Sequence, residues 1–214
     1  MLKPGVVNRR LVGEVIERLE KVAEIRRNSP TKSVQRDAET PMLFTQIRQP
    51  STTYLVVPEV SSERRKYIPI GYMNPDTIAS NKLYLISDAS LCMFGILISN
   101  VHMAGMRIVA GRLEMRHSYS PAVYNNFPWC EPTEAQKASI EKTAQAILDA
   151  RALYPDCSLA DLYDEATMPP ELRKAHQAND KAVMKAYGYA PSMTEPEIVA
   201  DLMKRYQELT EQEK

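Results

Sequence analysis

The feature that most constrains the fold is the apolar run at residues 89–110, ASLCMFGILISNVHMAGMRIVA. A helix that is hydrophobic on most of its sides must be buried. Asn100, His102 and Arg107 interrupt the run, so no stretch reaches the ~18 apolar residues that a membrane span needs. The run therefore predicts a core helix, and we expect no membrane contact.

The limits of this core helix are set by its flanking residues. Asp88 or Ser90 has the side-chain oxygen that an N-cap requires, and Gly111 lies where a C-cap glycine would end the helix. We therefore expect one helix over residues 91–110. The proline-interrupted segment SYSPAVYNNFPW (118–129) is then predicted to be non-helical.

The segments before this helix differ in the spacing of their apolar side chains. Residues 7–27 have apolar side chains at helical spacing, which predicts an amphipathic helix that must pack on something. Residues 42–88 instead contain short runs rich in β-branched and aromatic residues, which predict a small, mostly antiparallel sheet. Pro58 and Pro69 suggest edge or bulge positions for their strands. The expected strands lie within residues 42–49, 52–60, 66–73 and 82–88.

The chain after Pro132 is helical in character. Thr133 and Thr194 can each cap a helix, and the sequence MPPEL places a proline in the first turn of another. We therefore predict an α+β fold: a small antiparallel sheet with a buried helix, followed by an all-α C-terminal helical subdomain. The predicted domains are residues 1–130 and 131–214.

Charge is divided unevenly between these two parts. The chain of 214 residues has no net charge, yet residues 1–130 hold 17 Lys and Arg against 11 Asp and Glu. Residues 131–214 hold 10 basic against 16 acidic residues. This asymmetry indicates that the first part faces a polyanion, whereas chance asymmetry is the alternative.

Cysteine usage points to a reducing compartment. Cys92, Cys130 and Cys157 are too few and too widely spaced for a metal-ligand pattern or a disulfide framework. The N-terminal residues lack the apolar core of a signal peptide. We therefore expect a cytoplasmic protein with reduced thiols.

Catalytic and metal-binding patterns are absent from the sequence. His102, His117 and His176 fall in a predicted core helix, a loop and a surface helix, and none has a second ligand at i+3 or i+4. No nucleophile elbow, phosphate-binding glycine loop or dinucleotide fingerprint occurs. The sequence Asn126-Phe127-Pro128-Trp129 lacks the proline that must follow asparagine in an amino-methyltransferase loop. We expect Phe127 and Trp129 to pack between the two parts instead.

Two polar segments suit contact with nucleic acid. SSERRK (61–66) places hydroxyls and three cations in one turn, which fits phosphate contact, although a solvated hairpin tip is the alternative. Glu114 and Arg116 would point the same way in an extended chain. A carboxylate accepts from cytosine N4 and a guanidinium donates to guanine, so the pair could read one C·G base pair. A mutual salt bridge is the simpler interpretation.

Longer motifs resemble a known family. VPEVSSERRKYIPIGYM (57–73), GRLEMRHSYS (111–120), VYNNFPWCEPTEAQK (123–137) and residues 148–183 together resemble the C-terminal part of MmeI-like type IIL restriction–modification enzymes. The resemblance runs from about residue 7 to residue 210. It implies a target recognition domain followed by a C-terminal helical region.

This resemblance implies a function and its partners. Enzymes of this family join an endonuclease region, a helical connector and an adenine-N6 methyltransferase domain upstream of these two regions. The chain is therefore expected to bind double-stranded DNA and to direct a methyltransferase domain, present in cis or as a separate subunit. S-adenosylmethionine is expected in that upstream domain, and no cofactor is expected in this chain.

The resemblance also implies DNA-reading residues. By matching motif context, Glu114 and Arg116 form one base-reading pair, Glu59 and Asn81 a second, and Lys82 and Ser118 a third. The phosphate contacts are expected from Arg64, Arg65, Lys66 and Arg112.

Two other functions compete with DNA reading. A protein-interaction scaffold that touches no nucleic acid would use mainly the acidic helices and the Met-rich core helix. A self-contained enzyme is the weakest alternative, because no nucleophile–base or ligand constellation is readable.

Overall fold

The computed structural model describes residues 9–44, 48–113 and 116–212. Its contacts divide the chain into two compact units, Met1–Gln49 and Pro50–Lys214. The predicted domain boundary at 130/131 stays a prediction. Residues on both sides of it share the same cores, as the packing of Leu55 with Leu172 in one cluster shows.

The first unit contains α1 (Arg9–Arg27), α2 (Lys32–Arg36) and the 3₁₀ helix η1 (Asp37–Glu39). Arg26 holds the returning chain, because its guanidinium donates to the carbonyls of Asp37, Thr40 and Leu43 at 2.9, 3.0 and 2.7 Å. The helix predicted at 7–27 is confirmed as α1. In the described part of residues 42–49 no strand forms, so the first predicted strand is wrong there.

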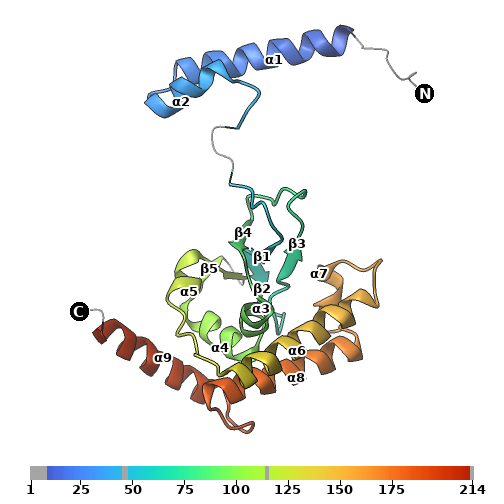
Figure 1. Ribbon diagram of the computed structural model, residues 1–214, viewed down its shortest axis with the longest axis vertical. Coiled ribbons are helices and arrows are strands. Elements are labelled where there is room, and N and C mark those ends of the chain that lie inside the picture. The colour runs from blue at the N-terminus through green and yellow to red at the C-terminus, as the bar shows by residue number, and fades with distance from the viewer. Residues whose placement is uncertain (1–8, 45–47, 114–115, 213–214) are drawn as a thin grey trace. The chain divides into compact units, whose positions relative to one another are not determined.

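Two small antiparallel sheets lie in the second unit (Figure 1). Sheet A has the order β3-β1-β4 and is built from β1 (Tyr54–Pro58), β3 (Gly71–Met73) and β4 (Leu83–Ser87). Sheet B has the order β2-β6-β5 and is built from β2 (Val60–Ser62), β5 (Gly111–Leu113) and β6 (Arg116–Ser118). Antiparallel pairing is confirmed throughout.

The prolines do not mark edge strands as predicted. Pro58 is the last residue of β1, the central strand of sheet A, opposite Leu83. It is tolerated because the strand ends there and the chain passes to sheet B through Glu59. Pro69 lies outside the strands of the described chain.

The predicted core helix is two helices, α3 (Leu91–Leu97) and α4 (Asn100–Val109). Ser90 caps the first by accepting from the Met93 N–H, and Ser99 caps the second by accepting from the His102 N–H. The internal cap at Ser99 offers the backbone an alternative to a continuous helix, which explains the break. The C-cap is Ala110, and Gly111 begins β5 instead of ending the helix.

No single helix of the described chain is long and apolar enough to span a membrane. α3 and α4 meet that test only as a pair bent by 56°. Both helices are largely buried, as Phe94, Leu97 and Val101 illustrate at 0% exposure.

The segment after sheet B contains a short helix, α5 (Pro121–Asn125), so the prediction of no helix there is wrong. Pro121 stands at the start, where a missing N–H removes no helical hydrogen bond. The predicted C-terminal helices are confirmed as α6 (Glu134–Ala152), α7 (Leu159–Leu162), α8 (Pro170–Tyr187) and α9 (Glu195–Gln212). The α+β class is therefore confirmed.

Helices α6 and α8 run side by side and cover α3 (Figure 1). Thr133 and Gln136 form a capping box at the start of α6, as the predicted cap requires. His176 in α8 is fully buried, so its prediction as a surface residue is wrong. The sequence misleads here because α8 packs against α6 on one side and faces Tyr67 on the other.

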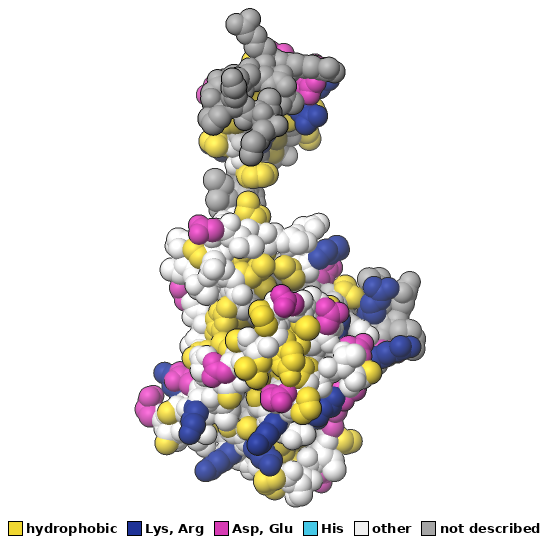
Figure 2. All heavy atoms as spheres, turned by 90° about the vertical axis from the view of Figure 1, so that its right-hand side faces the viewer, with side chains coloured by type: hydrophobic (Ala, Val, Ile, Leu, Met, Phe, Trp, Pro, Cys, Tyr) yellow, Lys and Arg dark blue, Asp and Glu magenta, His cyan; other side chains and the backbone are white. Residues whose placement is uncertain are grey.

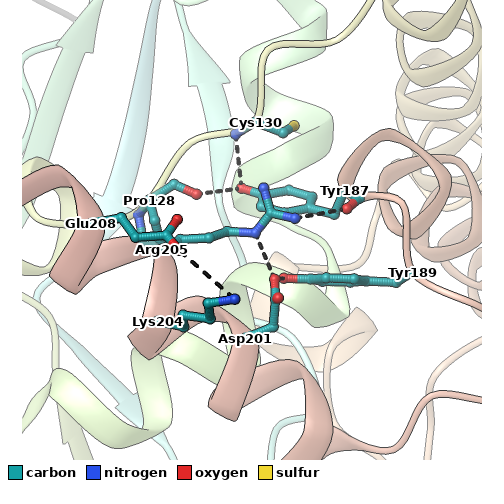
Figure 3. Close-up of polar contacts among 8 residues, drawn as sticks. All are labelled: Pro128, Cys130, Tyr187, Tyr189, Asp201, Lys204, Arg205 and Glu208. Carbon is teal, nitrogen blue, oxygen red and sulfur yellow. Dashed lines mark hydrogen bonds and ion pairs between the residues drawn. The ribbon is translucent and has the colours of Figure 1, made fainter.

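The chain passes from the β-rich part to the helices at residues 127–130. The Tyr187 hydroxyl donates to the Pro128 carbonyl at 3.1 Å and accepts from the Cys130 N–H at 3.2 Å (Figure 3). Trp129 packs against both core clusters. Its ring meets the Phe127 ring edge-on, with the ring centroids 5.4 Å apart. The prediction that this aromatic segment packs between the two parts is confirmed.

Candidate nucleic-acid interface

Sheet B has one buried face and one outward face. Along β6, Arg116 is exposed, His117 is buried and Ser118 is half-buried. Side chains alternate along a strand, so Arg116 and Ser118 share the outward face and His117 faces the core. Ser61, opposite His117, is likewise buried. The outward face of sheet B, defined by Val60, Ser62, Arg116 and Ser118, is the candidate interface.

One end of the outward face carries the hairpin between β5 and β6. Ser62 lies opposite Arg116 in the register of β2 and β6. Arg112 lies in β5 opposite His117. Glu114, the predicted partner of Arg116, lies outside the described residues. Arg116 itself is exposed.

The other end of the outward face brings three predicted residues together. The Glu59 N–H donates to the Lys82 carbonyl at 3.0 Å, and the Tyr119 N–H donates to the Glu59 carbonyl at 2.7 Å. These bonds place Glu59, Lys82 and Ser118 at the junction of the two sheets. Asn81 is exposed beside them.

The ion pair at this junction joins two residues that the resemblance assigns to different base-reading pairs. Lys82 Nζ lies 3.1 Å from Glu59 Oε2, whereas the resemblance couples Glu59 with Asn81 and Lys82 with Ser118. The Lys82 side chain is 70% exposed, so solvent screens the ion pair. The Glu59 side chain is 28% exposed, so Lys82 is the more accessible partner of the pair.

We expect Lys82→Gln to change the free energy of unfolding by less than ~1 kcal/mol, because an exposed ion pair contributes about that much or less. Urea denaturation of the two proteins measures the difference. A loss of more than about 2 kcal/mol would contradict the prediction and make the pair a structural element.

The SSERRK turn leaves sheet B beside the hairpin end. The Arg65 N–H donates to the Ser62 carbonyl at 3.1 Å, which closes the turn. Arg64 and Lys66 are exposed, while Arg65 is half-buried with Nη2 3.5 Å from the Ala160 carbonyl oxygen. The structure thus places a cationic turn next to Arg116.

The dimensions of the outward face match a few base pairs. Strands advance ~3.3 Å per residue, so its two ends, two residues apart, are separated by roughly 7 Å. That distance is about two base-pair steps at 3.4 Å each. Contacts at both ends would therefore fall on base pairs about two steps apart.

Sequence analysis missed Val60 and Ser62 as members of this face. Both lie on the outward side, opposite Ser118 and Arg116 respectively. The available signal was the alternation within Val60-Ser61-Ser62, but which serine points outward depends on the strand pairing.

The charge of the first half is not concentrated on sheet B. Residues 1–49 hold ten of its basic residues against six acidic ones, whereas residues 50–130 hold seven against five. On the face of the second unit drawn in Figure 2, Lys and Arg are interspersed with Asp and Glu. No group of three or more His, Cys, Asp or Glu suitable for a metal ion occurs among the described residues.

The fold and the outward face together define a recognition module: a small β-rich platform with an exposed polar edge, braced by helices. Models of two protein families match the chain. The model for the MmeI target recognition domain matches residues 8–131, and the model for the MmeI C-terminal domain matches residues 132–213. The chain belongs to the MmeI target recognition domain family.

Two relatives support this assignment. DNA methyltransferase A of Bacillus subtilis (strain 168) is 41% identical over 187 residues, which cover 87% of this chain and 21% of the relative. The solved structure of the type IIL restriction-modification enzyme MmeI in complex with DNA is 46% identical, with a TM-score of 0.83. The match covers 97% of this chain and 28% of that one. The chain therefore spans less than a third of either protein.

Proposed function

We propose that this chain binds double-stranded DNA and reads its sequence for a type IIL restriction–modification enzyme. The observation that carries the proposal is the outward face of sheet B, where Arg116 and Ser118 project together from one strand. Membership of the family and the DNA complex of the related MmeI support it.

Base reading would use the two ends of this face. Arg116 would donate to guanine in the major groove, and Glu114 would accept from cytosine. At the other end, opening the exposed Glu59–Lys82 pair would free a carboxylate and an ammonium for neighbouring bases. Asn81 and Ser118 are the remaining proposed base-reading residues. Each good base contact is worth ~1–3 kcal/mol of discrimination.

Phosphate contacts would fix the register of the module on the duplex. Arg64, Arg65 and Lys66 lie in the turn beside Arg116, and Arg112 lies in the adjacent strand β5. Such contacts carry affinity and salt dependence but little sequence information. In this division of labour the turn beside the hairpin end would hold the phosphates, while the two ends of the outward face read bases.

The chemistry would belong to a domain upstream of this chain. There a methyltransferase domain would bind S-adenosylmethionine, extrude the adenine from the duplex and methylate N6. This chain would fix the sequence at which that occurs. We place the parent enzyme in the cytoplasm, which accords with the unpaired thiols of Cys92, Cys130 and Cys157.

The proposal is tested by selecting duplexes from a randomised pool. Exchanging the charges with Glu114→Lys and Arg116→Asp should change the preferred base pair at one position, because donor and acceptor trade places. Binding of the unchanged chain should weaken steeply with added salt. Sequencing of the bound pool reports the preference.

A matched exchange provides the control. Lys204→Glu with Glu208→Lys also conserves net charge but reverses an exposed ion pair on α9, and it should leave the preference unaltered. Identical preferences at every position for the Glu114/Arg116 exchange would overturn the assigned reading loop. Absence of duplex binding at low salt would instead favour the scaffold function.

A further inference from the structure

The SSERRK turn returns to the core at a buried tyrosine held by the C-terminal helices. The Tyr67 hydroxyl donates to Asp180 Oδ2 at 2.7 Å, and the carboxylate lies on α8. The other carboxylate oxygen accepts from the Asn100 N–H at 2.8 Å, at the start of α4. Asp180 is only 8% exposed, so its position is fixed by these two bonds and by packing.

The Tyr67 ring also has close contacts. It stacks on His176, with the ring centroids 4.1 Å apart. His176 lies one helical turn before Asp180, and its Nε2 is 2.7 Å from the Tyr163 hydroxyl. Lys66 Nζ lies 5.3 Å from the centroid of the Tyr67 ring. The end of the turn is thus anchored from two successive turns of α8.

A second anchor joins the same end of the turn to α9. Arg107 Nη2 donates to the Lys66 carbonyl at 3.0 Å. Arg107 Nη1 lies 2.8 and 2.9 Å from the two carboxylate oxygens of Glu195, the first residue of α9. The guanidinium therefore ties the backbone of the turn to a helix far along the sequence.

We infer that Tyr67, Asp180 and Arg107 are positioning residues that hold the cations of the SSERRK turn ready for phosphate contact. The inference rests on the proposed function. Ordering a flexible turn during binding costs conformational entropy, and a turn anchored beforehand avoids that cost. The acidic C-terminal helices thus contribute to DNA affinity without touching DNA themselves.

The test is a double-mutant cycle measured with a fluorescein-labelled duplex of mixed sequence and the full chain. Tyr67→Phe keeps the ring stack but removes the hydroxyl, and it should weaken binding by about three- to tenfold and lower the salt slope by about one. In a background of Arg64→Gln, Arg65→Gln and Lys66→Gln, the same change should weaken binding no further, because the cations it positions are gone.

A matched tyrosine separates positioning from general loss of stability. The Tyr189 hydroxyl also donates to an aspartate, Asp201, at 2.7 Å, but away from the turn (Figure 3). Tyr189→Phe should lower the melting temperature much as Tyr67→Phe does and leave DNA affinity unchanged. Equal weakening by Tyr67→Phe in both backgrounds, or none in either, would overturn the inference.

A second pair of variants covers the case in which Tyr67→Phe does not fold. Arg107→Gln should weaken DNA binding by the same factor, whereas Arg205→Gln should not. The control is close, because Arg205 also contacts one carboxylate, Asp201, and one backbone carbonyl, that of Tyr187 (Figure 3). If Arg107→Gln binds like the unchanged chain, the inference fails.

The failures of the inference and of the proposed function are distinguishable. If Arg64→Gln, Arg65→Gln and Lys66→Gln together leave DNA affinity and the salt slope unchanged, the turn does not contact phosphate, and the inference falls while base reading by sheet B is still decided by the Glu114/Arg116 exchange. If those three changes weaken binding but Tyr67→Phe and Arg107→Gln do not, only the positioning role is lost.

Discussion

Gly95→Ala should destabilise the second unit by about 3 kcal/mol or more, although alanine favours helices over glycine. A β-carbon at this position would lie 2.6 Å from Ile140 Cγ2, 3.0 Å from Asn179 Oδ1 and 3.2 Å from Ala144 Cβ. These atoms belong to α6 and α8, which press on α3 from two directions. Neither helix can withdraw without opening the core of the unit.

The damage should include a buried polar contact as well as steric strain. Asn179 Nδ2 donates to the Gly95 carbonyl at 2.7 Å, and Asn179 is fully buried. Moving α8 away from α3 would break this hydrogen bond and leave the amide and the carbonyl buried without a partner. That adds ~1–3 kcal/mol to the loss of stability. Thermal and urea unfolding of the two proteins measure the total.

Gly111→Ala is the control for this substitution. Its added β-carbon would meet Ser118 Cβ at 3.8 Å, an ordinary contact. We therefore expect a change within ~0.5 kcal/mol. If Gly95→Ala were as mild as Gly111→Ala, the close approach of α3, α6 and α8 would be wrong.

Acid should destabilise the chain through His102. Burial lowers the pKa of His102 to about 4 from its ordinary value of 6.5. Between these values the unfolded chain binds a proton that the folded chain does not, so stability is full above pH 6.5 and falls as the pH drops towards 4. The expected loss of unfolding free energy is about 2 kcal/mol between about pH 7 and pH 5.

Burial also shifts the pKa values of two other groups. Burial also lowers the pKa of His176 well below its ordinary value, which adds to the acid sensitivity. Burial raises the pKa of Asp180, so the folded chain binds its proton first and this group opposes the loss at low pH. Both contributions are common to the unchanged protein and a His102 variant, so the difference between the two isolates His102.

Replacing the imidazole tests this assignment. His102→Gln keeps a polar group near the Tyr119 hydroxyl, which lies 3.1 Å from His102 Nε2, but cannot titrate. Its unfolding free energy, measured with urea at several pH values, should fall by about 2 kcal/mol less than that of the unchanged chain. Tyr119→Phe should lower stability at every pH and keep the pH dependence. Parallel curves for His102→Gln and the unchanged chain would contradict the prediction.

Parts of the candidate site were readable from the sequence and parts were not. The alternation around Arg116 and the cations of SSERRK each predicted exposed polar groups, because these signals are local, but the pairing of β2 with β6 that brings them together was not predictable. The pairing of Glu59 with Lys82 was not predictable. It depends on the crossing from sheet A to sheet B, which brings together strands that lie far apart in the sequence.

By itself the sequence determined the long helices and the extended runs that contain β1, β3 and β4, because side-chain periodicity and capping residues act over a few neighbours. Ser90, Thr133 and Pro170, the first residue of α8, are examples. Only the tertiary structure decided that His176 is buried and that Tyr67 meets Asp180. These outcomes follow from contacts between distant segments, whose free energies exceed the local preferences that a sequence pattern records.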